Sequence, residues 1–206
     1  TTLITYTLTD ATTGCVNTKT ATVTVNPLPS IITTGALSSV CYSASSQTTT
    51  LAYTATTFTP TSYSINWDDT ANASGLADQT TTAFAFVAGS SSITAIPVAA
   101  GVPVGTYNGT MTISNGNSCI KTQTVSIIVY AYPVVPAITG TMSVCVNSTT
   151  TLANSYTSVT NVWSSSNTAI ATVGASTGVV TGISAGTCTI TYSVTGPGGC
   201  TSLVTA

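Results

Sequence analysis

Charged side chains are nearly absent from this sequence of 206 residues. It has two lysines and four aspartates, but no arginine, glutamate or histidine. Charged residues make up 3% of the chain, whereas a soluble domain usually has about 25%. The deficit is large enough to exclude whole classes of function.

The missing side chains exclude most catalytic and nucleic-acid-binding functions. General acid–base catalysis uses a histidine, a glutamate or a tuned lysine in a pocket, and a nucleophile relay needs histidine. No two cysteines form a C-x-x-C pair, and zinc sites with histidine ligands are excluded. Two lysines cannot neutralise a phosphate backbone. We therefore expect a non-enzymatic protein that binds no nucleic acid, metal or cofactor.

Small hydroxyl side chains are abundant instead. Threonine occurs 48 times and serine 26 times, so 74 of the 206 residues carry such a group. Apolar residues make up 43%, which does not fit a disordered chain, and threonine and valine favour strands. No stretch reaches the ~18 uninterrupted apolar residues of a membrane helix. The composition predicts a folded β protein without membrane insertion.

Two sequence patterns recur along the chain. Ile4-Thr5-Tyr6 matches Ile190-Thr191-Tyr192, and a turn and a cysteine follow each segment; residues 107–119 are a third copy. Ser39-Val40-Cys41 matches Ser143-Val144-Cys145, and a threonine-rich strand follows each segment. Such repeats indicate tandem domains.

The repeats predict a division into three parts. We expect residues 1–26 to be the C-terminal hairpin of a preceding domain, residues 28–132 to be one whole domain, and residues 134–206 to be a second domain that lacks its final strand. Prolines stiffen both joints, at 27–29 and at 133. A window that begins and ends inside equivalent domains is expected of a slice of a long repetitive fibre.

The predicted fold class is all-β, with tandem immunoglobulin-like β-sandwich domains. Runs that alternate with period two, such as residues 21–25, are separated by turn signals such as residues 196–199. About 100 residues per unit suits such a sandwich. Each unit has one tryptophan, Trp67 or Trp163. We expect both rings in the core on the third strand; the alternative is an exposed ring that stacks on sugars.

The six cysteines indicate an oxidising compartment. The domain frame predicts pairing within domains, Cys41 with Cys119 and Cys145 with Cys200, so that each bond would tie the start of a domain to its last hairpin. Cys15 would then pair with a residue upstream of the sequence.

Cys188 has no partner in that frame, because it lies where the first copy of the repeat has Thr2. It is either a free buried thiol or an alternative partner of Cys145. The order of cysteines along a chain does not decide their connectivity.

Longer motifs carry a family resemblance. The segments WSSSNTAIATV (163–173) and TGVVTGISAGT (177–187) make residues 140–195 resemble a bacterial immunoglobulin-like domain of group 2. Residues 28–132 contain YTATTFTPTSYSINWDDTAN, VPVGTYNGTMTISN and a late cysteine. They are similar to a repeat of the very large secreted surface proteins of Bacteroidota, including gliding-motility-associated adhesins.

The resemblance implies a place on the extracellular cell surface and export by the type IX secretion route. It brings no catalytic residues, and such repeats are mostly spacers that hold a binding tip away from the cell. The implied partners are neighbouring repeats of the same chain or identical chains in a filament, with surface glycans as a further class.

One short motif predicts a modification. Asp69-Thr70-Ala71 resembles O-glycosylation acceptor sites in Bacteroidota, so Thr70 is a candidate for glycan attachment. Asp68, Asp69 and Asp78 are weak candidates for calcium, which takes six to eight oxygen ligands, because the EF-hand spacing and glutamate are both missing. We expect a solvated loop here and no metal.

Three functions remain after these exclusions. The first is a disulfide-stabilised stalk segment of a surface adhesin or filament. The second is a subunit of a polymeric filament, completed by a strand donated from the neighbouring chain. The third is a carbohydrate-binding module, which requires exposed aromatic rings among the nine tyrosines.

Overall fold

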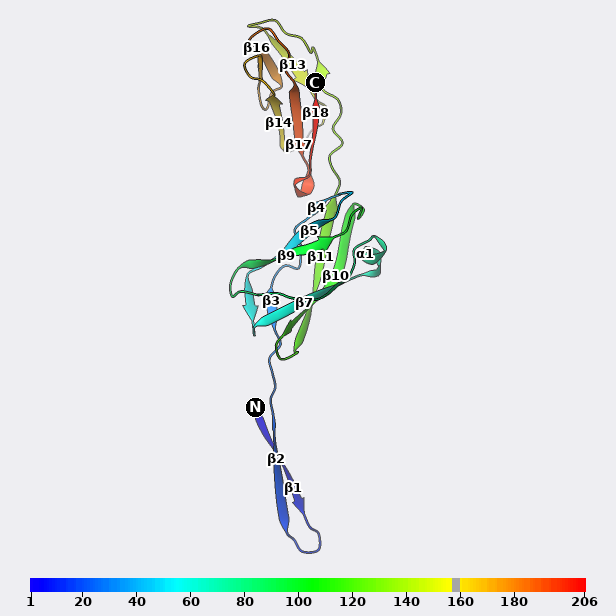
Figure 1. Cartoon of the computed structure of the whole chain (residues 1–206), viewed down its shortest axis with the longest axis vertical. Coiled ribbons are helices and arrows are strands. Elements are labelled where there is room, and N and C mark those ends of the chain that lie inside the picture. Colours follow the sequence, from blue (N-terminus) through cyan, green and yellow to red (C-terminus); the bar gives the residue numbers. More distant parts are fainter. Residues whose placement is uncertain (157–159) are drawn as a thin grey trace.

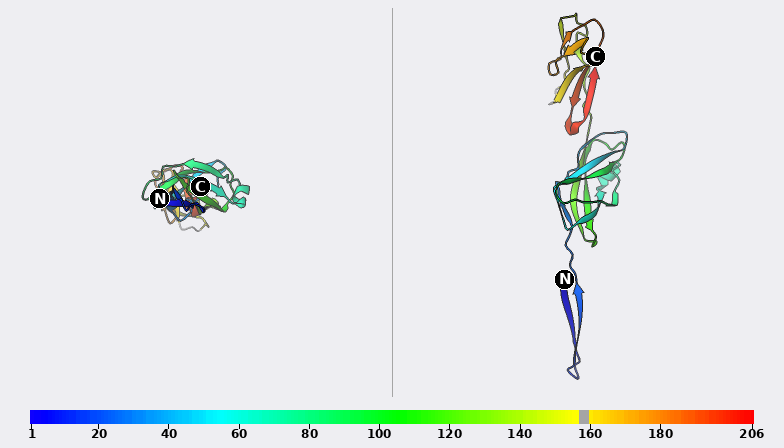
Figure 2. Two further views of the ribbon diagram at one scale, coloured as in Figure 1. Left: turned by 90° about the horizontal axis from the view of Figure 1, so that it is seen from below. Right: turned by 60° about the vertical axis from the view of Figure 1, so that its left-hand side comes forward.

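The computed structural model describes residues 1–156 and 160–206, which form three bodies arranged end to end (Figure 1). An N-terminal hairpin is followed by a first sandwich, whose buried core residues run from Ile31 to Val129, and a second sandwich, whose buried core residues run from Ile138 to Val194. The right-hand view of Figure 2 shows the same rod, and the left-hand view looks along its long axis. Strands account for nearly all regular structure in the described residues, so the prediction of an all-β fold is confirmed.

The N-terminal hairpin pairs β1 (Thr2–Thr9) with β2 (Val16–Val23), and every residue of both strands is exposed. Its turn is closed by Asp10, whose Oδ1 accepts hydrogen bonds from the backbone N–H groups of Thr12 and Thr13, each at 2.8 Å. These bonds, that of Thr13 above all, hold the pKa of the Asp10 carboxyl below its usual value. The ionised form of Asp10 therefore favours the closed turn.

The first sandwich has a five-stranded sheet in the order β4-β11-β10-β7-β8, with the pairs β5-β9 and β3-β6 beside it. Short β4 runs parallel to the end of β11, and the other pairs are antiparallel. The five-residue helix α1 contacts β7 and β10. The bounds are β3 (Ser30–Ile32), β4 (Val40–Cys41), β5 (Gln47–Tyr53), β6 (Ala55–Thr57), β7 (Pro60–Trp67), α1 (Asp69–Ala73), β8 (Gln79–Ala83), β9 (Ser91–Val98), β10 (Gly105–Asn115) and β11 (Ile120–Tyr130).

The second sandwich has one sheet in the order β12-β13-β16-β15 and another in the order β14-β17-β18. The 3-10 turn η1 joins the last two strands. The bounds are β12 (Thr139–Gly140), β13 (Thr149–Ala153), β14 (Thr160–Ser165), β15 (Ala171–Val173), β16 (Val179–Gly182), β17 (Ile190–Thr195), η1 (Pro197–Gly199) and β18 (Thr201–Thr205).

Each sandwich has its own apolar core, as the alternating strand pattern predicts. That of the first includes Leu51, Ile65 and Met111, all at most 1% exposed. Both tryptophans are buried, Trp67 at 3% and Trp163 at 6% exposure, and Trp163 packs on the ring of Tyr192. The expected core position is therefore confirmed for both rings, and neither is free to stack on a sugar.

The last two strands of each body form a hairpin with the same direction along the rod. The hairpins β1-β2, β10-β11 and β17-β18 all point their tips toward the lower end of Figure 1. Each tip carries a cysteine, Cys15, Cys119 or Cys200, and we call these three the late cysteines. Cys41 and Cys145, which precede the threonine-rich strands, are the early cysteines.

Candidate functional site

A disulfide bond joins the two sandwiches. It connects Cys41 of β4 in the first sandwich to Cys200, which follows η1 in the second, with the two Cα atoms 5.6 Å apart and a sequence separation of 159. Cys41 lies beside Tyr130 at the end of β11, and the N–H of Tyr42 donates to the carbonyl of Tyr130 at 2.8 Å. The bond thus closes the junction between the end of one domain and the hairpin tip of the next (Figure 1).

Glycines let the hairpin tip approach the first sandwich closely. Gly198 has a φ of 68°, and a Cβ on it would lie 2.3 Å from a ring carbon of Tyr130 and 3.2 Å from Oγ of Ser39. A Cβ on Gly196 would lie 2.9 Å from Cγ of Pro133 in the linker. The turn Gly196-Pro-Gly-Gly199, which the sequence marks only as a turn, is therefore also a docking surface.

Replacing Gly198 by alanine should weaken this junction selectively. The added Cβ meets the Tyr130 ring only when the sandwiches are docked, so Gly198→Ala should shift the equilibrium between the oxidised and reduced Cys41–Cys200 pair about tenfold toward reduction, equivalent to about 1.4 kcal/mol. Titration with dithiothreitol measures this shift.

The matched control is Gly199→Ala, because Gly199 also has a positive φ, 79°, but no atom lies within 4 Å of its Cβ position. Its backbone strain is the same in the docked and undocked states, so the redox equilibrium should stay unchanged. Equal behaviour of the two variants would contradict a packed junction.

The observed disulfide overturns the predicted pairing within domains. Cys41 is bonded to Cys200, and Cys119 and Cys145 are free. The physical reason is strand direction: Cys119 precedes the first residue of β11, whereas Cys41 lies beside its last residue, Tyr130. The eleven residues of β11 span ~36 Å, and a disulfide requires Cα atoms within about 7 Å.

The remaining thiols lie in distinct places. Cys15 and Cys145 are exposed, whereas Cys119 and Cys188 are half-buried. The Sγ of Cys119 lies 3.8 Å from the carbonyl of Asn26, in the linker that leads to the N-terminal hairpin. Cys188 packs against the core of the second sandwich and is a free thiol, which is one of the two alternatives left open by the sequence.

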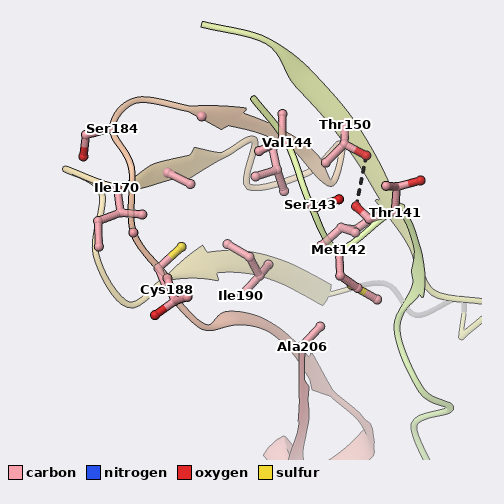
Figure 3. A pocket seen from close by; sticks show the side chains of 16 residues that line it. Thr141, Met142, Ser143, Val144, Thr150, Ile170, Ser184, Cys188, Ile190 and Ala206 are labelled. Atoms are coloured by element: carbon pink, nitrogen blue, oxygen red, sulfur yellow. Dashed lines mark hydrogen bonds between the residues drawn. The ribbon is translucent and has the colours of Figure 1, made fainter. Parts of the chain in front are cut away.

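A groove of ≈ 320 Å³ runs along the second sandwich (Figure 3). Residues 141–144 form one wall, Cys188 and Ile190 lie opposite, and Ala206 lies at one end. The lining is largely apolar apart from hydroxyl groups. It is a feature that the sequence does not reveal.

In the first sandwich, the second half of β11 occupies the corresponding place. Counted from the late cysteine, Ala206 corresponds to Val125, and both pair with the preceding strand, at Ile190 and Gly109. Past Val125, the side chains of Ile127 and Val129 enter the core and are 0% and 1% exposed. The groove of the second sandwich therefore has the position and lining of a site for an extended strand with alternating apolar residues.

The residues singled out near Trp67 have structural partners. Asp68 caps α1 by accepting from the N–H of Ala71 at 2.8 Å, and Asp78 accepts from the N–H of Trp67 at 2.9 Å. Thr70 is exposed in the first turn of α1, and its glycosylation stays a prediction. Among the described residues, no group of three metal-ligating side chains is close enough to hold an ion.

The exposed tyrosine rings lie on separate parts of the rod. Tyr6 belongs to the N-terminal hairpin, Tyr42 follows β4 and Tyr132 lies in the linker, with exposures of 66%, 41% and 48%. They come from three segments rather than from one sheet face. No helix in the described residues has the length and apolar character needed to cross a membrane.

Comparison with known proteins gives one family match. Residues 133–198 match the model of the bacterial Ig-like domain (group 2), which confirms that part of the resemblance. No curated protein matches the chain.

Among solved structures, the chain is similar to a chain in the crystal structure of the C-terminal 282-residue fragment of intimin in complex with the translocated intimin receptor (Tir) intimin-binding domain. The identity is 16% and the TM-score is 0.35. The similarity covers 82% of this chain and 60% of that one.

Proposed function

We propose that this chain, whose residues 133–198 match a group 2 bacterial Ig-like domain, is a non-enzymatic structural segment of an extracellular stalk or surface filament. The observation that carries the proposal is the disulfide between consecutive sandwiches. A covalent bond between domains that already follow each other in the chain adds no chemistry at a ligand site. The bond instead restricts the position of one domain relative to the other, which is what a rigid spacer requires.

The surface composition fits a stalk outside the cell. A disulfide persists in an oxidising compartment, and a chain rich in serine and threonine can keep its surface polar with almost no charge. Contacts of such a surface depend little on salt, because there are few charges to screen. More specifically, we propose that the chain belongs to a Bacteroidota adhesin of the gliding-motility type that the type IX secretion route exports. Its partners would be the neighbouring repeats.

A two-copy chain tests the stalk function. Ala206 and Ala21 both stand six residues after a late cysteine, so residues 1–206 can be joined to residues 22–206 without breaking the repeat. Small-angle X-ray scattering should show a rod, with a maximum dimension that grows by about the length of the added sandwiches. A compact particle whose sandwiches lie side by side would overturn the proposal.

The groove beside Ala206 favours a second function, the acceptance of a strand from a neighbouring chain. An added strand is held by backbone pairing along the edge and by alternate side chains in the pocket. Residues 22–25 read Thr-Val-Thr-Val, and by the count from the late cysteine Val23 and Val25 correspond to the core residues Ile127 and Val129. This segment is therefore a matched probe for the groove.

Extending the chain with this probe should stabilise the second sandwich. When residues 22–29 are appended after Ala206, burial of two valines contributes about 1.5–3 kcal/mol each, and ordering of the segment offsets part of it. A net gain of about 2 kcal/mol raises the melting temperature of this domain by about 10 °C. Calorimetry measures it.

The control carries the same extension with aspartate in place of both valines, and it should give no gain. An equal melting temperature for all three chains would contradict a strand-binding groove. Addition of the probe as a free peptide separates the two functions: stabilisation by the peptide supports donation between chains, and stabilisation only by the appended segment supports continuation within one chain.

A further inference from the structure

The early and late cysteines occupy repeated positions in the rod. Ser39-Val40-Cys41 and Ser143-Val144-Cys145 are identical in sequence. In the first sandwich, the segment beside Cys41 forms the parallel bridge between Ala36 and Ser126 and the parallel pair β4-β11. In the second, residue 146 forms a parallel bridge with Gly182. Each early cysteine thus lies on a parallel edge segment of its sandwich.

The two ends of each sandwich carry different cysteines. The late cysteine is at the hairpin tip, which faces the preceding body in the rod (Figure 1). Cys41 lies at the opposite end of the first sandwich, where the second one docks. The carbonyl of Cys145 lies against Gly182, the last residue of β16, at the end of the second sandwich that points away from the junction (Figure 1).

We propose that Cys145 and Cys119 each form an inter-domain disulfide of the Cys41–Cys200 type with a cysteine of a neighbouring domain. Cys145 would receive the hairpin-tip cysteine of an Ig-like domain that follows, and Cys119 would bond to the early cysteine of the domain that contains the N-terminal hairpin. This inference rests on the proposed tandem stalk. It extends one observed bond into a regular series along the fibre.

Exposure and location support these assignments. Cys145 is an exposed thiol, open to an incoming hairpin tip. Cys119 is half-buried beside the carbonyl of Asn26, so it already lies where the chain enters from the preceding body. Cys119 and Cys145 cannot form a disulfide with each other within one chain, because they lie at the outer ends of different sandwiches with the Cys41–Cys200 junction between them.

The chemistry is thiol–disulfide exchange. One thiol of the pair attacks the disulfide of an oxidised dithiol–disulfide oxidoreductase, and the second thiol then displaces the reduced enzyme from the mixed disulfide. Two thiols become one S–S bond, and the two electrons and two protons pass to the oxidoreductase, which leaves as a dithiol. A small-molecule disulfide can serve as the oxidant in vitro.

The two-copy chain, residues 1–206 joined to residues 22–206, tests the proposal. Cys119→Ser in the first copy and Cys145→Ser in the second make the remaining Cys145 and Cys119 unique. After oxidation with glutathione disulfide, free thiols are alkylated and the disulfide-linked peptides are identified by mass spectrometry. We expect Cys145 of the first copy bonded to Cys119 of the second, as completely as Cys41 is bonded to Cys200 in each copy.

Two results would overturn the proposal: alkylated Cys145, or Cys145 bonded to Cys188 or Cys200 of its own sandwich. Scattering on the same sample separates this failure from failure of the stalk. A rod with alkylated Cys145 would contradict the series of disulfides but support the stalk. A compact particle would contradict the stalk itself. A chain with Cys145→Ser in both copies is the control, and its second-copy Cys119 should be fully alkylated.

Discussion

Stretching the oxidised chain from its two ends should extend it by only ~160 Å, and reduction should release a further ~540 Å. The Cys41–Cys200 bond closes a loop with a sequence separation of 159, so force is carried through the two sulfur atoms, and the elements from β5 to β17 lie outside the path. Only residues 1–41 and 200–206 remain to be pulled straight, at ~3.4 Å each. Single-molecule force spectroscopy with and without dithiothreitol measures both lengths.

Two variants make this experiment specific. Cys41→Ser removes the bond and should give the full extension without reductant. Cys188→Ser removes a half-buried free thiol in the second sandwich and should leave the extension restricted. Equal extension of the native chain in the oxidised and reduced states would contradict an inter-domain disulfide.

Gly178→Ala should destabilise the second sandwich by about 3–5 kcal/mol. Gly178 has a φ of 70°, which costs an alanine about 1–2 kcal/mol. Its Cβ would lie 2.4 Å from the carbonyl oxygen of Leu152, so the backbone must move and the Leu152 N–H to Gly178 carbonyl bond of 2.9 Å is strained or lost, at about 1–3 kcal/mol. The same Cβ would press on the Trp163 ring at 3.2 Å.

The melting temperature of this domain should fall by about 15 °C or more, since 1 kcal/mol corresponds to about 4–8 °C for a domain of this size. In a Trp67→Phe background, fluorescence reports on Trp163 alone. Gly199→Ala is the control, because it has the positive φ without the contact and should lose only about 1–2 kcal/mol. A loss no larger than that of the control would show that the Leu152 contact does not matter.

The sequence predicts the strands and the cores well, because both depend on local patterns. Alternation of apolar and polar residues identifies the buried face of β11, where Val125, Ile127 and Val129 point inward. Trp67 and Trp163 are recognised as core residues because large rings surrounded by strand patterns are usually buried. The family motif within residues 133–198 is confirmed as well.

The disulfide partner could not be predicted in the same way, because it depends on which end of a strand each cysteine occupies. Counting along the chain pairs the first cysteine of a domain with the last, but the last strand carries Cys119 away from Cys41. One signal was available: in a sandwich whose early segment runs parallel to its last strand, a cysteine before that strand and one beside its end cannot meet. The groove gave no signal, since its lining comes from separate segments between Thr141 and Ala206.

The position of Cys41 has a consequence for biogenesis. During synthesis Cys41 precedes its partner by 159 residues, and Cys119 becomes available well before Cys200 does. An oxidant that reaches the unfolded chain would trap the nearer pair. Once the first sandwich has folded, β11 holds Cys119 ~36 Å away from Cys41, and only Cys200 can reach it. Correct maturation therefore requires folding to precede oxidation, because the folded first sandwich prevents Cys41 from bonding to Cys119.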